Sequence, residues 1–112
     1  MYKIIFYEDK KGSAPVLEYI SSLAVRDDQE STKKFNRIMD YIEKLRDGSN
    51  YVKHFDGEIW ELRPIKDRIL FAAWIENSFV LLHQFRKETQ KTPRSEIEKA
   101  QRELDDFKSR KI

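Results

Sequence analysis

Residues 59–86 read IWELRPIKDRILFAAWIENSFVLLHQFR, and this stretch decides the fold. Its runs of aromatic, β-branched and other apolar side chains predict three β-strands, at 59–63, 68–75 and 79–86. The links between these strands have the length of hairpin connections, so the strands are expected to lie side by side and antiparallel. The uninterrupted apolar run of the last strand favours a position covered on both faces.

The chain before this stretch is predicted to form a strand and then two helices. Residues 2–7 are aromatic and β-branched apart from Lys3, which is typical of a strand. A first helix is predicted after the cap Ser13 and Pro15, and a second from Asp27 or Asp28 to Gly48. Their apolar stripes are Val16, Leu17, Ile20 and Leu23 in the first helix and Phe35, Ile38, Met39, Ile42 and Leu45 in the second.

A last helix is predicted after Thr92 as its cap and Pro93 as its opening residue. Its inward stripe consists of Ile97, Ala100, Leu104 and Phe107. The predicted order is therefore β-α-α-β-β-β-α, and no Pro/Gly/Ser-rich stretch divides the chain. We expect a single α+β domain over residues 1–112, with a mainly antiparallel sheet packed by a helical hairpin and a C-terminal helix.

The composition limits the classes of protein that this chain can represent. Charged residues make up 38% of it, yet the formal net charge is only +2, so overall charge does not by itself indicate a nucleic-acid-binding protein. The chain has no cysteine, which excludes thiol nucleophiles and thiolate metal sites and suits a reducing cytoplasm. Because no apolar run approaches the roughly 18 residues of a membrane span, we expect a cytoplasmic protein without a membrane segment.

Common catalytic motifs are missing from the sequence. There is no Gly-rich phosphate loop, no paired metal-ligand spacing and no serine in a nucleophile-like turn. The two histidines, His54 and His83, lie far apart in the sequence. We therefore expect neither a metal nor another cofactor.

What remains is a group of cations at the predicted strand ends and just after them. These residues are Arg63, Arg68, Arg86, Lys87, Lys91 and Arg94. Antiparallel pairing can bring the strand ends together, and Arg68, at a strand start, is expected to reach solvent. Arginine forks and lysine charges bind phosphate groups. Basic residues at strand ends are more often simply solvated, so the cations alone leave both interpretations open.

Three further polar residues have alternative interpretations. Glu61 shares a predicted strand face with Arg63, and we interpret it as a group that orients this arginine rather than as a catalytic acid or base. His83 lies inside an apolar strand, where a packed histidine is the more frequent role and substrate contact the alternative. For His54, just before the predicted meander, a surface role and a packing role are equally open.

Four blocks of the sequence are distinctive: Tyr51-Val52-Lys53-His54-Phe55, Trp60-Glu61-Leu62-Arg63-Pro64, Asp67-Arg68-Ile69-Leu70-Phe71 and Phe85-Arg86-Lys87-Glu88-Thr89-Gln90-Lys91-Thr92-Pro93. In this order they resemble the phage-derived HigB-like branch of the RelE toxin superfamily, and the resemblance covers nearly the whole chain. It implies a RelE-like fold. It also implies the toxin of a type II toxin-antitoxin system, an endoribonuclease that cleaves messenger RNA on the ribosome and so inhibits translation.

The resemblance also implies a mechanism, in which the ribose 2′-hydroxyl attacks the adjacent phosphate without a metal or a protein nucleophile. Arg68 matches the strand arginine that such toxins place against the scissile phosphate, and Arg86 and Lys87 match the basic end of the last strand. These three are the expected catalytic residues, since cations stabilise the charge of the phosphorane. The expected RNA-binding residues are Arg63, Lys91, Arg94, His54 and His83.

The sequence departs from the resemblance near its C-terminus. Many relatives carry a tyrosine there that stacks on a base or assists proton transfer, whereas the final helix of this chain has Phe107 and no tyrosine. Lys87, Lys91 or a histidine would then have to transfer the proton. An amine or imidazole crowded by arginines has a lowered pKa, which suits that role.

The partners implied by the resemblance are the ribosome with its messenger RNA and a cognate helix-turn-helix antitoxin of the HigA kind. A toxin-antitoxin heterotetramer fits this pattern, with operator DNA contacted only through the antitoxin. Two alternatives remain: a module that binds RNA or the ribosome without cutting, favoured by the missing tyrosine, and an inactive phage-derived protein of the same fold. New transcript ends after expression would exclude the first, and toxicity in cells without the antitoxin would exclude the second.

Overall fold

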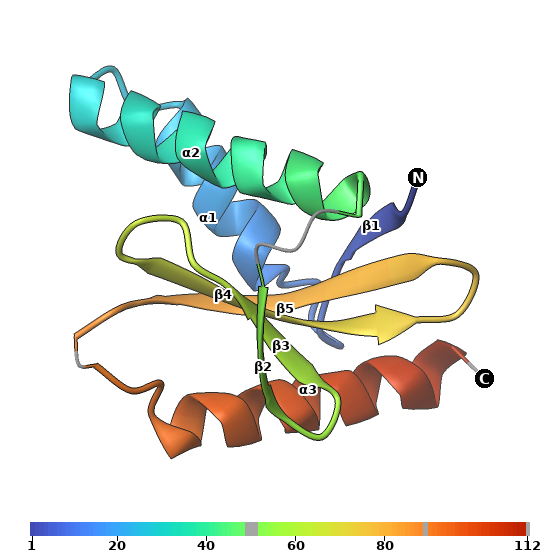
Figure 1. The fold of residues 1–112 in the computed structure, drawn as a ribbon. Helices are drawn as coiled ribbons and strands as arrows, with labels where there is room; N and C mark the ends of the chain where they lie inside the picture. The colour runs from blue at the N-terminus through green and yellow to red at the C-terminus, as the bar shows by residue number, and fades with distance from the viewer. Residues whose placement is uncertain (49–51, 89, 112) are drawn as a thin grey trace.

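The computed structural model describes residues 1–48, the backbone of residues 52–56, and residues 57–88 and 90–111. Its helices and strands follow one another along the chain as in Figure 1: β1 (Lys3–Phe6), α1 (Pro15–Ala24), α2 (Gln29–Arg46), β2 (Val52–Asp56), β3 (Ile59–Leu62), β4 (Asp67–Trp74), β5 (Ser78–Arg86) and α3 (Arg94–Lys111).

The described strands form one sheet in the order β1-β5-β4-β3-β2. β1 runs parallel to β5, and every other neighbouring pair is antiparallel. β5 lies inside the sheet, and its side chains enter a buried cluster on each face, Leu81 on one and Val80 and Leu82 on the other. The prediction that this strand is covered on both faces is confirmed. The predicted α+β class, the mainly antiparallel sheet and the hairpin meander of residues 59–86 are confirmed.

The predicted order is wrong at one point, because residues 52–56 form strand β2 rather than a connection. β2 pairs with β3 alone, and in this pairing His54 lies opposite Trp60. An edge strand has one neighbour and often carries polar residues, so Lys53 and His54 hide the alternation that would have identified it. The Asp56-Gly57 pair is a strong hairpin signal, and Gly57 has a φ of 55° as such a turn requires.

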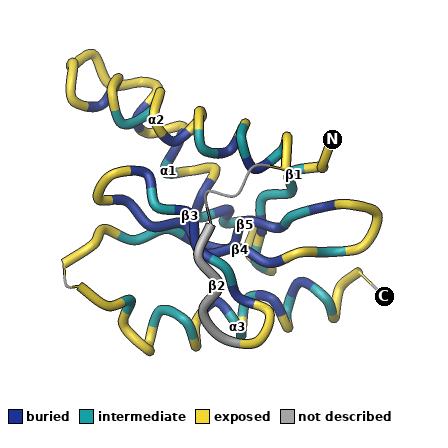
Figure 2. The backbone as a smooth tube through the Cα atoms, viewed as in Figure 1, coloured by how far each residue is buried: buried dark blue, intermediate teal, exposed yellow. Residues whose placement is uncertain are grey.

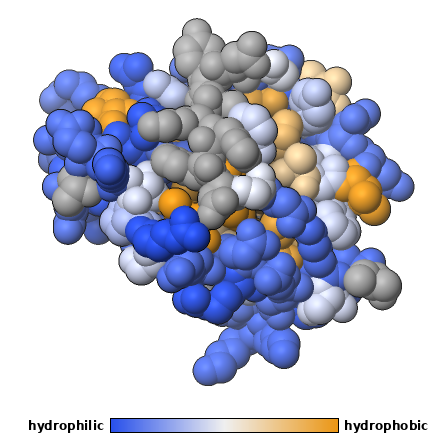
Figure 3. Space-filling model, turned by 60° about the horizontal axis from the view of Figure 1, so that its bottom comes forward, coloured by the Kyte–Doolittle hydropathy of each residue, from blue (hydrophilic) through white to orange (hydrophobic). Residues whose placement is uncertain are grey.

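Helices cover both faces of the sheet (Figure 1). The α1-α2 hairpin packs on one face, where Ile38 and Ile42 meet Ile69 and Leu81 in a buried cluster. α3 packs on the other face through a second cluster that contains Ala100, Leu104, Phe107, Leu70 and Val80. Figure 2 shows the buried residues concentrated in the sheet between the helical layers, and Figure 3 shows a mostly hydrophilic surface on the α3 side.

The edges of the predicted helical stripes are less buried than their centres. Leu17 is 44% exposed and Met39 is 36% exposed, although the sequence places both on inward stripes. A helix packed on another helix and a sheet buries the centre of its stripe first, which accounts for the difference. No helix in the described part of the chain is both long enough and apolar enough to cross a membrane.

Two of the predicted helix caps are wrong. The N-cap of α1 is Ala14 rather than Ser13, and its N–H donates to Glu18 Oε2 at 3.0 Å. α3 begins at Arg94, and the Thr92 hydroxyl donates to Glu61 Oε2 at 2.7 Å instead of capping the helix. In both places the predicted cap hydroxyl donates to a glutamate, Ser13 to Glu18 and Thr92 to Glu61.

The ends of α2 are those that the sequence predicts. The Asp28 side chain accepts a hydrogen bond from the Ser31 N–H at 2.9 Å, and this bond lowers the pKa of the carboxyl group. Gly48 follows the C-cap Asp47 with a φ of 87°, a conformation that glycine adopts without strain.

A β-bulge changes which side chains of β5 face α3. Leu70 of β4 pairs with His83, but the next residue, Phe71, pairs with Leu81, so Leu82 is the extra residue. As a result, Leu82 joins the apolar cluster under α3 while its neighbour His83 hydrogen-bonds to side chains of the same helix. Without the bulge, alternation would turn one of the two toward the helical hairpin.

Candidate active site

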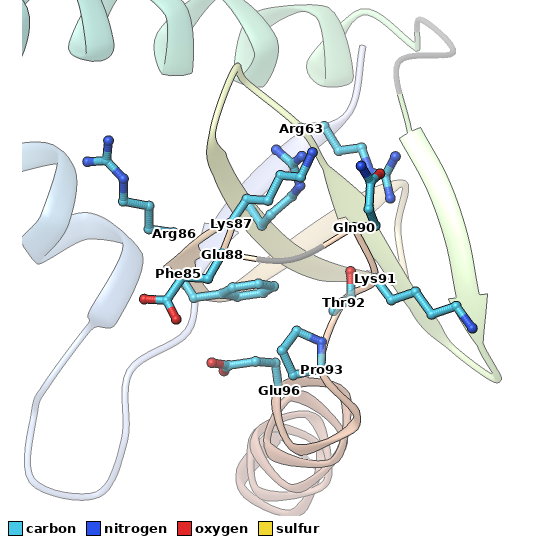
Figure 4. A pocket seen from close by; sticks show the side chains of 11 residues that line it. Arg63, Phe85, Arg86, Lys87, Glu88, Gln90, Lys91, Thr92, Pro93 and Glu96 are labelled. Atoms are coloured by element: carbon cyan, nitrogen blue, oxygen red, sulfur yellow. The ribbon is translucent and has the colours of Figure 1, made fainter.

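An open cleft of about 240 Å³ lies where the C-terminal ends of β3 and β5 meet the start of β4 and the entry to α3 (Figure 4). It is lined by Arg63, Arg68, Phe85, Arg86, Lys87, Glu88, Gln90, Lys91, Thr92, Pro93 and Glu96. The fold therefore brings the predicted cations of three strand ends to one cleft.

Glu61 is the buried acid behind the cations of the cleft. Its side chain is 0% exposed, its Oε1 accepts a hydrogen bond from Arg63 Nε at 2.6 Å, and its Oε2 accepts one from the Thr92 hydroxyl at 2.7 Å. Glu61 thus ties the end of β3 to the segment that enters α3. The prediction that Glu61 orients an arginine is confirmed.

Arg68 is less accessible than the sequence suggests. The residue is 8% exposed, and its Nη1 donates to the carbonyl oxygens of Ile65 at 2.9 Å and Asp67 at 2.8 Å. Its Nε lies 3.8 Å from Glu61 Oε1. The expectation that this side chain reaches into solvent is wrong, because the β3-β4 turn folds over it. Arg68 borders the cleft as a fixed charge held by the protein.

Arg86 and Lys87 are adjacent in the sequence but differ in direction. Arg86 pairs with Asp67, whose carboxylate accepts a hydrogen bond from the Tyr19 hydroxyl of α1 at 2.9 Å, so both belong to the hairpin face of the sheet. Figure 4 shows Arg86 extending toward α1, whereas Lys87 extends toward Arg63. Alternation along the strand therefore separates two residues that the sequence places in one group.

The contact between α1 and β4 changes the ionisation of Tyr19. Burial, followed by the hydrogen bond to Asp67, raises the pKa of Tyr19 to about 12. The cations Arg86 and Arg26 oppose this shift because they favour the charged phenolate. The uncharged phenol is thus the form that joins the hairpin to the strand carrying Arg68.

The other predicted RNA-binding residues differ in their position relative to the cleft. Lys91 lines the cleft and is exposed, and Figure 4 shows it extending away from Arg63 and Lys87. Arg94, with a side chain 70% exposed and 3.9 Å from Glu98, is not among the lining residues. The side chain of His54 lies outside the described residues.

His83 is buried rather than open to the cleft. Its side chain is 2% exposed and lies between two glutamates of α3. Its Nδ1 is 2.5 Å from Glu103 Oε1, and its Nε2 is 2.9 Å from Glu96 Oε1. Of these carboxylates, Glu96 also lines the cleft. His83 therefore fits the interpretation of a packed histidine. Glu96 connects it to the cleft.

Sequence reasoning missed Phe85 and Glu96 as residues of the cleft. Phe85 faces α3 with a partly buried ring, and in Figure 4 this ring occupies the middle of the cleft between Lys87 and Glu96. Phe107, the phenylalanine of the final helix, is 4% exposed and packs edge-on against Trp74, with the ring centroids 5.3 Å apart. The sequence carried no signal for Phe85, because its pairing with Arg68 across β4 and β5 depends on the β-bulge.

The charges of the cleft are mostly positive. Two acids line it, Glu88 and Glu96, and the buried Glu61 lies behind it. Among the described residues, the cations that line it are five: Arg63, Arg68, Arg86, Lys87 and Lys91. Within the described chain, no three histidine, aspartate or glutamate side chains are arranged to hold a metal ion. A positive cleft with an aromatic ring at its centre can hold a phosphate group beside a stacked base.

A family model described as Phage derived protein Gp49-like (DUF891) matches residues 22–105, which is most of the chain. The chain belongs to this Gp49-like family, which is a RelE/HigB-like toxin family. Toxins of this kind belong to toxin-antitoxin systems, so the family implies an antitoxin partner in general. No curated protein matches the chain.

Proposed function

We propose that this chain is the toxin of a type II toxin-antitoxin system and that it cleaves messenger RNA on the ribosome. The observation that carries the proposal is the cleft itself, in which Arg63, Arg68 and Lys87 surround one space beside the Phe85 ring. The family supports a toxin, and the cations support a substrate with a phosphodiester backbone.

The cations of the cleft and its aromatic ring each have a role in this proposal. Arg68, held by two carbonyl groups and facing a buried carboxylate, is a preorganised charge beside the scissile phosphate. Lys87 approaches the same phosphate with a flexible ammonium group. Arg63 and Lys91 bind the flanking phosphates, and the Phe85 ring stacks on a base.

Arg86 and Arg94 lie further from the proposed reaction. Arg86 borders the cleft but extends toward the hairpin face, so we assign it to positioning the RNA or the ribosome rather than to stabilising the phosphorane. Arg94, at the exposed start of α3, is assigned to the same peripheral contacts. His54, whose side chain lies outside the described residues, stays in the proposal as an RNA-binding residue on the strength of the sequence alone.

The reaction we propose begins with the ribose 2′-hydroxyl. Its oxygen bonds to the adjacent phosphorus, the bond from phosphorus to the 5′-oxygen breaks, and the products are a 2′,3′-cyclic phosphate and a 5′-hydroxyl. The extra negative charge of the phosphorane is where fixed cations act most strongly, since they need no reorganisation during the step.

The partners we propose are the ribosome and an antitoxin with a helix-turn-helix domain, of the HigA kind. The antitoxin would hold the toxin inactive in the cytoplasm, in a heterotetramer or a smaller complex, and would alone contact operator DNA. These assignments rest on the resemblance of the sequence and on the family, which implies an antitoxin without specifying its type.

Mapping transcript 5′ ends after brief expression tests the proposal. Cleavage predicts new ends at fixed positions within codons, in cells that lack the antitoxin. A second candidate function, binding the ribosome without cutting, is favoured by the absence of a tyrosine from the final helix. It predicts growth arrest with no new ends, and this result would overturn the nuclease proposal.

A further inference from the structure

Three ionisable side chains form a line that passes through a buried histidine and ends at the cleft. Glu103 Oε1 lies 2.5 Å from His83 Nδ1, and His83 Nε2 lies 2.9 Å from Glu96 Oε1. The side chain of His83, in the middle of the line, is 2% exposed, that of Glu103 is 11% exposed, and that of Glu96 is 29% exposed. Glu96 is the member that lines the cleft.

The hydrogen-bond pattern fixes the orientation of the Glu96 carboxylate. A carboxylate only accepts hydrogen bonds, and which ring nitrogen of His83 donates depends on the tautomer of the imidazole. The contact between His83 and Glu103 attaches α3 to β5. The second contact holds Glu96 Oε1 against the buried ring, and the other carboxylate oxygen remains available to the cleft.

The remaining carboxylates near the cleft are less suited to accept a proton from a substrate. Both oxygens of Glu61 are already hydrogen-bonded, and its side chain is 0% exposed. Glu88 is exposed at the rim and forms no hydrogen bond or ion pair with the described residues. A general base has to be both accessible and held in place, and Glu96 meets both conditions.

We propose that Glu96 is the general base of the cleft and that His83 and Glu103 are positioning residues that act through it. The inference rests on the proposed function. The free oxygen of Glu96 takes the proton of the 2′-hydroxyl as the 2′-oxygen bonds to phosphorus. The bond to the 5′-oxygen breaks, and the departing oxygen takes a proton from the Lys87 ammonium, which lies across the Phe85 ring from Glu96 in Figure 4. Proton exchange with water restores both groups.

The direct test is single-turnover cleavage of messenger RNA bound to purified ribosomes by the full-length chain and its Glu96→Gln variant. A positioned general base contributes on the order of 100- to 10,000-fold to a rate, so the cleavage rate of Glu96→Gln at saturating ribosomes should fall by that range. Its affinity for ribosomes should stay unchanged, because glutamine keeps the size of the side chain. Glu98→Gln, on the exposed side of the same helix, is the matched control and should cleave at the rate of the parent.

The positioning role predicts a separate result for His83→Gln and Glu103→Gln. Each should reduce the single-turnover rate of the folded protein by a smaller factor than Glu96→Gln, with the ribosome affinity close to that of the parent. Each should also lower the thermal unfolding midpoint, because the contact attaches α3 to β5. A purely structural role would lower the unfolding midpoint in the same way but leave the cleavage rate of the remaining folded protein unchanged. If one variant does not fold, the other provides the same comparison.

The outcomes separate this inference from the proposed function. If the parent cleaves and Glu96→Gln cleaves within a few-fold of it, Glu96 is not the base and the inference is wrong, while the nuclease proposal stands. If the parent itself leaves ribosome-bound messenger RNA intact, the proposed function is wrong and the inference falls with it.

Discussion

At the residue scale, Arg86 and Lys87 show that a shift of one position along a strand changes the face on which a side chain lies. They are equivalent cations in the sequence, yet Lys87 extends into the cleft and Arg86 toward the hairpin face. A substitution of each therefore tests which face carries the reaction. Both side chains are exposed, so neither substitution should disturb the fold.

We expect Lys87→Ala to reduce the rate of messenger RNA cleavage by about 100- to 1,000-fold, the usual cost of losing one group that stabilises charge in a transition state. Arg86→Ala should reduce it by a much smaller factor and act mainly on ribosome affinity. Single-turnover cleavage and ribosome co-sedimentation measure the two effects. A larger loss of rate for Arg86→Ala than for Lys87→Ala would mean that the hairpin face carries the chemistry.

Tyr19 provides a prediction about stability at high pH. Its pKa is raised from 10.0 to about 12, so the folded state holds the phenolic proton more tightly than the unfolded state does. The stabilisation from this proton is fully present below pH 10 and is lost as pH rises through about 12. Denaturant unfolding should therefore show a steeper loss of stability over this pH window for the parent than for Tyr19→Phe. Parallel stability curves for the two proteins would contradict the assignment.

At the scale of elements, the turn between β3 and β4 contains an unfavourable residue. Ile65 has a φ of 56°, and the Asp67 N–H donates to the Pro64 carbonyl oxygen at 3.0 Å. A positive φ at the first central position alone is the pattern of a type II′ turn, in which glycine is the preferred residue. A β-branched side chain is strained in this region, and the side chain is 61% exposed.

We expect Ile65→Gly to raise the free energy of unfolding by about 0.5–1 kcal/mol, since relief of left-handed strain exceeds the added flexibility of the unfolded chain. Ile75→Gly is the control, because Ile75 is an exposed isoleucine in the β4-β5 turn without a positive φ. This control should be destabilised. Urea unfolding of both variants decides the matter, and equal losses of stability would show that the Ile65 turn is not strained.

The elements also show where sequence patterns stop being informative. Helix and strand periodicity identified α1, α2, α3 and the meander because each buries one clear apolar stripe. β2 was missed because it is an edge strand whose sequence lacks this alternation. The burial of Arg68 could not be predicted either, because it depends on the path of the β3-β4 turn and on Glu61, which is seven residues away.

At the scale of the whole molecule, the strand-end cations lie on two faces of the sheet, with Arg86 on the hairpin face and Lys87 in the cleft. The family and the strand-end cations could be recognised from the sequence, and the fold places most of these cations at one cleft. The line from Glu103 through His83 to Glu96 could not be recognised, because it depends on a β-bulge and on the docking of α3. Such long-range contacts carry no periodic signal in the sequence.

The central claim is that the cleft promotes attack by the 2′-hydroxyl on messenger RNA held by the ribosome. The most direct measurement uses two ribosome-bound messages that differ in one atom, a ribose and a 2′-deoxyribose at the mapped scissile nucleotide. We predict that the purified chain cleaves the first message to a 2′,3′-cyclic phosphate and a 5′-hydroxyl and leaves the second intact at that position. Cleavage of the deoxy message at the same bond would contradict the account.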